Sequence, residues 1–194
     1  MSEVLDLQAK YTKEIRPELS KELGGLNVHD TPRLDKVVIN SGIGKIVNVR
    51  RAKSTGQQTE EEMVEDIIEG IALIAGQRPH LIRARKSISG FKLREGTATG
   101  LRVTLRGKKM YDFVARLNNV ALPRMRDFRG IKVKAVDQNG NLTIGVKESS
   151  IFPEVPPSNK QWGLQVTLVT NTEDRKEALE LFRKLGVPLQ KEEK

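Results

Sequence analysis

Apolar residues recur at helical spacing in four segments of this chain. In the N-terminal segment they form one stripe with a four-residue period, which stops at Gly24-Gly25. Pro17 lies inside this stripe, so it either kinks the helix or opens a second one at its first turn. The same period returns near residues 63–75, 110–117 and 173–185. The pattern predicts three or four amphipathic helices.

Between the helices, short β-branched or alternating runs predict strands. These runs are residues 34–39, 80–84, 91–94, 101–105, 142–146 and 162–168. In the run 101–105 three aliphatic residues alternate with Arg102, Thr104 and the following Arg106. A strand with this pattern hides its aliphatic side and presents two arginines and a threonine on the other. That polar face is the strongest local clue to function.

Strands with one aliphatic and one polar side, together with amphipathic helices, predict an α+β fold. The expected architecture is a two-layer sandwich, with a mostly antiparallel sheet, helices on one face and an open polar face. The chain is expected to form a single domain over residues 1–194, with a protruding basic loop at 85–94 that is too charged to be buried. Residues 47–59 are mostly polar or basic, and this composition predicts a flexible loop.

The positive charge is confined to one stretch. Residues 78–134 hold 16 Lys or Arg against three acids, a net of +13, whereas the rest of the chain holds 18 basic and 22 acidic residues, a net of −4. A local positive potential attracts a polyanion and releases its counterions on contact, so nucleic acid is the first partner to consider. A solvated basic surface without a specific partner is the alternative.

Composition argues against most other functions. The chain has no cysteine and two histidines, so neither a thiolate nor an all-imidazole metal site is expected, and no cofactor is predicted. We recognise no nucleophile motif, although a divalent-metal nuclease built from scattered carboxylates stays open as the alternative class. No apolar run approaches the length of a membrane span, and no signal pattern is present, so we expect a cytoplasmic protein without a membrane partner.

The side chains of the polar face suit structured RNA. Aromatic residues make up only 4% of the chain, which argues against a surface that stacks unpaired bases. Arg, Lys, Thr, Asn and Gln can instead bind phosphates, ribose hydroxyls and the shallow minor groove of an A-form helix.

Several longer motifs follow one another along the chain. They are residues 31–36 (TPRLDK), 40–44 (NSGIG), 75–79 (AGQRP), 84–94 (ARKSISGFKLR), 103–107 (VTLRG), 123–130 (PRMRDFRG) and 151–154 (IFPE). On these motifs the chain resembles the family of large ribosomal subunit protein five, from about Tyr11 to Pro188. The resemblance implies a structural, non-enzymatic protein that holds 5S rRNA in the central protuberance, with 23S rRNA as a further partner.

The resemblance also implies which residues meet RNA. The family's 5S rRNA contacts correspond to Asn40, Gln77 and Thr104, to which the polar strand face adds Arg102 and Arg106. The family's protruding loop contacts the transfer RNA in the peptidyl site, and small-subunit protein thirteen approaches this region. The corresponding residues here are Arg85, Lys86, Ser87, Ser89, Gly90, Phe91, Lys92 and Arg94.

We expect this loop to be mobile in isolation and ordered beside transfer RNA, because its cations repel one another without a polyanion. The alternative is a rigid hairpin in which Ile88 and Phe91 pack on the domain. The chain departs from the family in three places. The segment 47–59 resembles an exposed insertion, the link through Pro156 and Pro157 is shortened, and Gln165 stands where the family has an acid.

Overall fold

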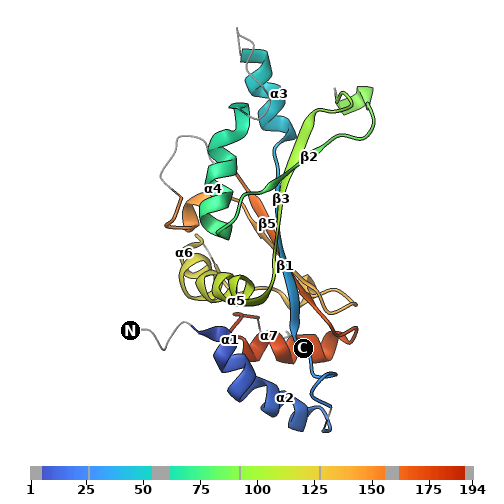
Figure 1. Cartoon of the computed structure of the whole chain (residues 1–194), viewed down its shortest axis with the longest axis vertical. Coiled ribbons are helices and arrows are strands. Elements are labelled where there is room, and N and C mark those ends of the chain that lie inside the picture. Colours follow the sequence, from blue (N-terminus) through green and yellow to red (C-terminus); the bar gives the residue numbers. More distant parts are fainter. Residues whose placement is uncertain are drawn as a thin grey trace. The chain divides into compact units, whose positions relative to one another are not determined.

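The fold is α+β, as predicted. The computed structural model describes residues 6–25, 27–53, 62–91, 93–126, 128–155 and 162–190. Its antiparallel sheet has the strand order β2-β3-β1-β5-β4 (Figure 1). The strands are β1 Leu34–Gly42, β2 His80–Arg83, β3 Ala98–Leu105, β4 Leu142–Val146 and β5 Leu164–Thr170. The helices are α1 Leu7–Lys10, α2 Arg16–Glu22, α3 Gly44–Lys53, α4 Glu65–Ala75, α5 Gly107–Arg116, α6 Leu122–Arg124 and α7 Arg175–Lys184.

The described residues form two compact units. Unit 1 comprises Met1–Val38, Thr104–Ile144 and Val166–Lys194, and unit 2 comprises Ile39–Val103 and Gly145–Gln165. Strands β1, β3, β4 and β5 each contain residues of both units. The division therefore falls inside strands, where composition gives no boundary signal, and the single-domain organisation stays a prediction.

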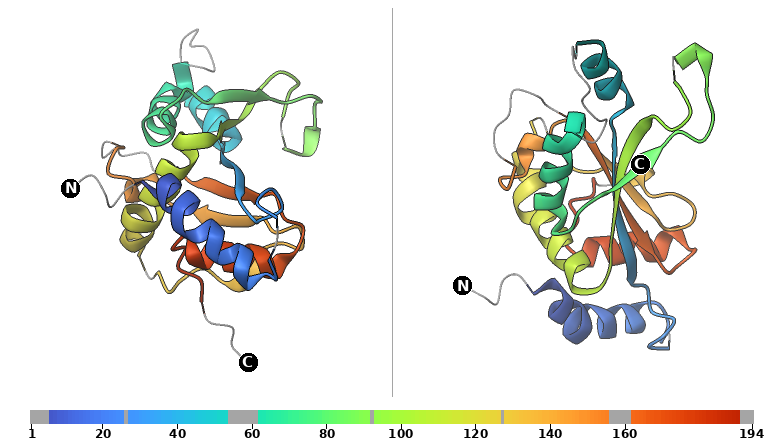
Figure 2. Two further views of the ribbon diagram at one scale, coloured as in Figure 1. Left: turned by 60° about the horizontal axis from the view of Figure 1, so that its bottom comes forward. Right: turned by 45° about the horizontal axis from the view of Figure 1, so that its top comes forward.

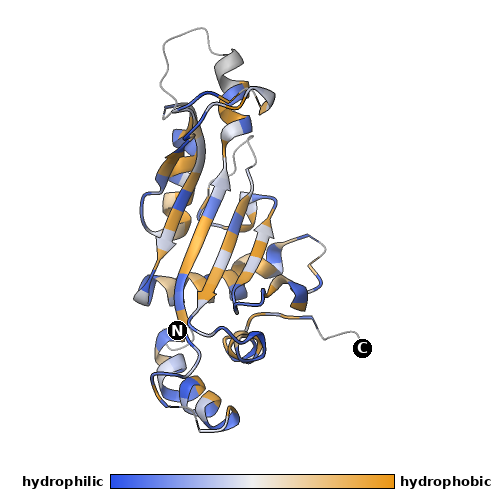
Figure 3. Ribbon diagram, turned by 90° about the vertical axis from the view of Figure 1, so that its right-hand side faces the viewer, coloured by the Kyte–Doolittle hydropathy of each residue, from blue (hydrophilic) through white to orange (hydrophobic). Residues whose placement is uncertain are grey.

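Each long strand has one buried and one more exposed side. Along β3, Leu101, Val103 and Leu105 are at most 3% exposed, and the residues between and after them are exposed. Strand β5 alternates in the same way. Figure 3 shows this alternation as apolar and polar bands along the strands. Period-two burial is what a sheet with one covered face requires.

The N-terminal helix of unit 1 is confirmed, and Pro17 opens its second part. A π-helical turn, Tyr11–Ile15, joins α1 to α2, and Pro17 lies in the first turn of α2, where its missing N–H removes no helical hydrogen bond. The Tyr11 ring stacks on that of Tyr111 from α5 at a centroid distance of 5.8 Å, and its hydroxyl donates to the Pro32 carbonyl at 2.8 Å. These contacts attach the helix to the rest of unit 1.

Helix α7 packs its apolar side into the core of unit 1 through Ala178, Leu181 and Phe182, as its period predicts. Its N-cap is Asp174, whose carboxylate accepts from the Lys176 amide at 2.8 Å. Near its other end the Lys184 ammonium donates to carboxylates of α2, and these hydrogen bonds, first to Glu22 and then to Glu18, raise the pKa of Lys184.

Helix α4 fills the core of unit 2. Its buried isoleucines lie on one side, and Gly76, at φ 68°, ends it in the left-handed conformation expected of a C-terminal glycine. Gly70 faces the buried Trp162, whose Cζ2 atom would lie 2.8 Å from an added Cβ. None of the helices that the structure describes is long and apolar enough to cross a membrane.

Two predictions from composition are wrong. Residues 47–53 belong to helix α3 instead of a loop, while 54–59 lie outside the described residues. Val47 of this helix and Ile43 just before it are both fully buried, so apolar contacts at a four-residue spacing help to hold the helix in place. The described residues of the predicted strand 91–94 belong to no named strand: Phe91 ends the 3₁₀ turn Ser89–Phe91, Leu93 makes an isolated bridge with Ile88, and Lys92 lies outside the described residues.

Candidate nucleic-acid interface

Strand β3 presents Arg102 and Thr104 to solvent, as the alternation predicts, and the exposed Arg106 follows the strand directly, as the N-cap of α5. All three are exposed, whereas the aliphatic residues between them are buried. Removing an exposed arginine from such a strand takes away charge without opening a cavity in the core. This face can therefore supply donors to phosphate or ribose oxygens at little cost to the fold.

Asp35 on strand β1 lies beside Arg106 in unit 1, a contact that the sequence reasoning missed. The Arg106 Nη1 atom donates to the Asp35 carboxylate at 3.0 Å and to its carbonyl oxygen at 3.3 Å. Both side chains are about half exposed, at 58% and 46%, so the pair is screened by water. The residues are 71 positions apart, and no local pattern could have indicated the contact. Arg106 thus carries a partly compensated charge.

Asn40 and Gln77, the other two predicted 5S rRNA contacts, belong to unit 2. Both are half-buried. Asn40 lies on β1 near Gly100 of β3, where an added Cβ would come within 3.4 Å of the Ser41 carbonyl and 4.0 Å of the Asn40 amide oxygen. Gln77 directly follows the turn that ends α4. Glycine at position 100 therefore leaves room beside Asn40.

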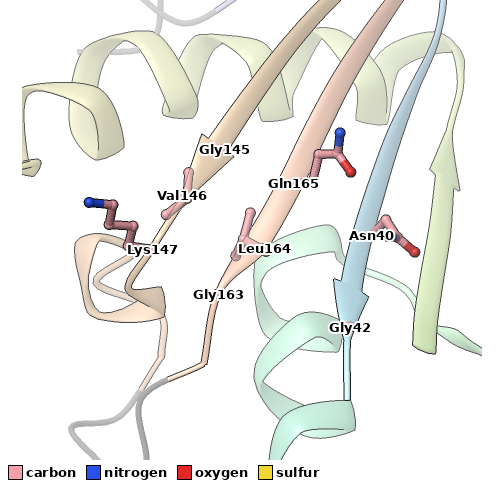
Figure 4. A pocket seen from close by; sticks show the side chains of 8 residues that line it. All are labelled: Asn40, Gly42, Gly145, Val146, Lys147, Gly163, Leu164 and Gln165. Atoms are coloured by element: carbon pink, nitrogen blue, oxygen red, sulfur yellow. The ribbon is translucent and has the colours of Figure 1, made fainter. Parts of the chain in front are cut away.

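An open pocket of about 380 Å³ lies in unit 2 along the ends of β1, β4 and β5 (Figure 4). Its lining comprises Asn40, Gly42, Gly145, Val146, Lys147, Gly163, Leu164 and Gln165. Figure 4 shows the Lys147 side chain directed away from the amides of Asn40 and Gln165. The polar groups are thus spread along the pocket and do not converge as the ligands of a metal would. Gln165 is exposed at this surface.

Glycines line much of this pocket, for two different reasons. A Cβ at Gly42 or Gly145 would meet nothing within 4 Å, so these positions leave bare backbone at the surface. A Cβ at Gly163 would lie 3.1 Å from the Val146 carbonyl, and the Gly163 carbonyl accepts from the Ser41 hydroxyl at 2.7 Å. A side chain at position 163 would therefore press on the backbone carbonyls of Val146 and Lys147, at the end of β4.

The predicted transfer RNA loop is the connection between β2 and β3 in unit 2 (Figure 2). Two backbone hydrogen bonds close its tip. The Ile88 amide donates to the Leu93 carbonyl at 2.9 Å, and the Leu93 amide donates to the Ile88 carbonyl at 3.1 Å. The Ser87 hydroxyl accepts from the Glu95 amide at 3.0 Å. These bonds fix the local course of the loop, while its mobility stays a prediction.

The loop exposes its apolar side chains together with its cations. Ile88 is 47% exposed and Phe91 is 77% exposed, so the alternative in which both pack on the domain is wrong. The other predicted contacts that the structure describes are all exposed: Arg85, Lys86, Ser87, Ser89, Gly90 and Arg94. Lys92 lies outside the described residues. The tip thus combines charge with one accessible aromatic ring.

The described residues contain no group of three or more His, Asp or Glu side chains placed to hold a metal ion. The arrangement of the exposed side chains suits hydrogen bonds and ion pairs with a polyanion.

Comparisons with known proteins decide the family. A model described as "Ribosomal protein L5" matches residues 27–94, and one described as "ribosomal L5P family C-terminus" matches residues 98–189. The chain belongs to the ribosomal protein L5 family.

Individual relatives are similar to this chain over nearly its whole length. The large ribosomal subunit protein uL5 of Leptospira biflexa is 47% identical over 184 residues, 94% of each chain. The uL5 of Limosilactobacillus reuteri is 43% identical over 187 residues, 95% of this chain and 98% of the relative. That of an Anaeromyxobacter strain is 44% identical, over 94% of this chain and 96% of the relative.

Membership in the L5 family gives the general role. This L5-family chain is a ribosomal protein of the large subunit, a structural constituent of the ribosome that associates with rRNA. The prediction that it is not an enzyme is confirmed by the family.

Proposed function

We propose that this L5-family protein binds 5S rRNA through the polar face of its sheet and contacts peptidyl-site transfer RNA through the loop 85–94. The proposed 5S contacts are Asn40, Gln77, Arg102, Thr104 and Arg106. The proposed transfer RNA contacts are Arg85, Lys86, Ser87, Ser89, Gly90, Phe91, Lys92 and Arg94. 23S rRNA and small-subunit protein thirteen complete the set of proposed partners.

The 5S part of the proposal rests on the exposure of Arg102 and Arg106, on the side opposite the buried aliphatic residues of β3. A strand face of this kind lets several donors meet one RNA surface while the core stays closed. The two arginines differ, however, because Arg106 is already paired with Asp35. Binding RNA has to compete with that carboxylate, so we expect Arg102 to contribute more to affinity than Arg106.

Affinity for 5S rRNA in a gel-shift titration tests this surface. Arg102→Ala should weaken binding about tenfold, in the range of one lost charge-assisted hydrogen bond. Arg106→Ala should weaken it less, and Asp35→Asn should strengthen it by releasing Arg106. The matched control is Arg183→Ala, which removes an exposed, ion-paired arginine from α7. Equal affinities for wild type and Arg102→Ala would place the 5S site elsewhere.

The exposed Phe91 beside the loop cations supports the transfer RNA part of the proposal. Arginine and lysine attract phosphates, and a ring that is 77% exposed can stack on a nucleobase. Neither role helps to stabilise the isolated fold.

A triple variant, Arg85→Ala/Lys86→Ala/Phe91→Ala, separates the two RNA contacts. It should bind 5S rRNA within about twofold of wild type but retain peptidyl-site transfer RNA less well in reconstituted ribosomes. Lost 5S affinity with an unchanged circular dichroism spectrum would assign the loop to the 5S site. Turnover of RNA with added magnesium would contradict the whole proposal.

A further inference from the structure

The turn that precedes β4 in unit 1 contains a chemically reactive pair of residues. Asn139 is the only asparagine of the chain that is followed by a glycine. In such a pair the main-chain nitrogen of the glycine can attack the asparagine side chain, because the glycine has no side chain to hinder the approach. The Asn139 side chain is exposed and has no hydrogen-bond partner among the residues that the structure describes. Its amide can therefore rotate towards the Gly140 nitrogen.

The reaction of this pair needs only water. The Gly140 main-chain nitrogen forms a bond to Cγ of Asn139, the Cγ–Nδ2 bond breaks, and the proton of the attacking amide leaves with the side-chain nitrogen as ammonia. The succinimide ring that results then takes up one water molecule. Opening at Cγ gives aspartate. Opening at the main-chain carbonyl gives isoaspartate, in which the main chain runs through the side-chain carbons, and neither route involves an oxidant or a reductant.

In the folded protein the packing of Gly140 opposes this ring closure. Its carbonyl accepts from the buried Thr170 hydroxyl at 3.0 Å, and its N–H donates to the Asp137 carbonyl at 3.4 Å. The space around its Cα is also filled, since an added Cβ would lie 3.2 Å from Cβ of Ala178. The peptide between Asn139 and Gly140 therefore cannot turn its nitrogen towards the side chain without breaking these contacts.

Further hydrogen bonds hold the turn closed. The Asp137 amide donates to the Asn141 carbonyl at 2.9 Å. The Asp137 carboxylate accepts from the Asn141 amide at 2.7 Å and from the Asn141 side chain at 3.1 Å. Val136 and Leu142, at the two ends of the turn, form a bridge. The ring should thus form only while the turn is open, so the rate of modification should follow how often the turn opens.

We propose that Asn139 is a self-modification site, at which the chain converts to aspartate or isoaspartate when the turn 137–141 opens, and that the Thr170 hydroxyl keeps this turn closed. Isoaspartate lengthens the main chain by one carbon atom and adds a carboxylate. Because the space around Gly140 has no room for even a methyl group, the lengthened turn cannot close as before. The modification therefore prevents the turn before β4 from forming again.

Peptide mass spectrometry of the full-length protein, after incubation in mildly alkaline buffer, tests this site. In urea Asn139 should be modified about tenfold faster, or more, than in the folded protein, because the turn is then always open. It should also be modified faster than Asn119, which is exposed but precedes a valine. The variant Asn139→Gln should show no modification at this position, because its longer side chain does not form the same ring.

Thr170→Val removes the hydroxyl that holds Gly140. It should speed modification of the folded protein about fivefold, the effect of one lost hydrogen bond. Asp137→Ala, at an exposed position, removes the carboxylate that binds Asn141 and should act in the same direction. The matched control is Thr143→Val, which removes a hydroxyl that bonds with Thr167 at 3.3 Å instead and should leave the rate unchanged. Circular dichroism shows whether each variant is folded.

The isolated isoaspartate form should melt at a lower temperature than the unmodified protein. Equal rates of modification in urea and in the folded protein would overturn the proposal, since the fold would then give no protection. An unmodified Asn139 in urea would overturn it as well, as would wild-type rates in folded Thr170→Val and Asp137→Ala. None of these measurements involves RNA, so their outcome is independent of the proposed 5S rRNA and transfer RNA contacts.

Discussion

Gly140 shows how a single residue can be fixed by its surroundings in unit 1. It has φ 73°, and an added Cβ would lie 2.7 Å from the Thr172 carbonyl and 2.9 Å from the Thr170 hydroxyl. Because backbone and side chain both block the space, we expect Gly140→Ala to lower the free energy of unfolding by about 2 to 4 kcal/mol. Urea unfolding followed by circular dichroism measures this change.

Gly186 is the matched control for Gly140. It also has positive φ, 80°, but an added Cβ would meet nothing within 4 Å. Gly186→Ala should therefore show only the cost of the left-handed backbone, about 1 kcal/mol. Equal losses at the two positions would mean that the close approach at Gly140 relaxes without cost.

Tyr111 should make unit 1 sensitive to alkali. Burial, reinforced by the neighbouring Tyr11, raises the pKa of Tyr111 to about 12 from 10.0. The folded state keeps the proton that the unfolded state releases, so stability is complete below pH 10 and is lost as the pH rises towards 12. Since one pKa unit corresponds to about 1.4 kcal/mol, the loss is at most about 3 kcal/mol.

The variant Tyr111→Phe isolates this effect. Between pH 9 and 11.5 its free energy of urea unfolding should fall less than that of wild type. The pKa of Lys184 is also raised, so its contribution to stability is likewise lost in alkali. Because Lys184 is present in both proteins, this contribution cancels when their free energies of unfolding are compared. The same pH slope in both proteins would show that Tyr111 does not titrate differently in the two states.

At the scale of elements, helix α4 shows packing overriding helix propensity. Alanine favours a helix interior over glycine by about 1 kcal/mol, yet a Cβ at Gly70 would come within 2.8 Å of the Trp162 ring. We expect Gly70→Ala to lower the melting temperature, because a buried ring on a packed core has little room to move. Leu73→Ala, at a position 52% exposed on the same helix, should change it little. A higher melting temperature for Gly70→Ala would show that Trp162 moves freely.

The elements also differ in how far their sequence specifies them. Helices α4, α5 and α7 and strand β3 follow from their periodicity, because one side of each packs in a core. Helix α3 does not, since its many polar residues suggest a loop; its Val47 is buried, as is Ile43 just before it. The tip of the β2–β3 connection is a turn because two backbone bonds close it, which side-chain patterns cannot reveal.

For the whole molecule, charge should dominate RNA binding. The stretch 78–134 carries a net +13 and includes Arg102, Arg106 and the loop cations. If six to ten phosphates are contacted, affinity for 5S rRNA should fall by about 10³ to 10⁵ between 50 and 200 mM salt. Filter binding across this range, with the melting temperature as a control for folding, measures the dependence. An affinity that stays within threefold would contradict a largely electrostatic contact.

The sequence by itself determined the fold class, the apolar sides of the main helices, the polar face of β3 and the family. These properties depend on local period, on composition and on motifs, all of which are present in the linear order of residues. Only the tertiary structure decided that Asp35 pairs with Arg106, that Gly70 faces Trp162 and that the backbone of Ile131 bonds to Pro188 and Gln190 of the C-terminal segment. Each of these contacts joins residues far apart in the chain, and their distance depends on how the whole chain packs, which no local pattern records.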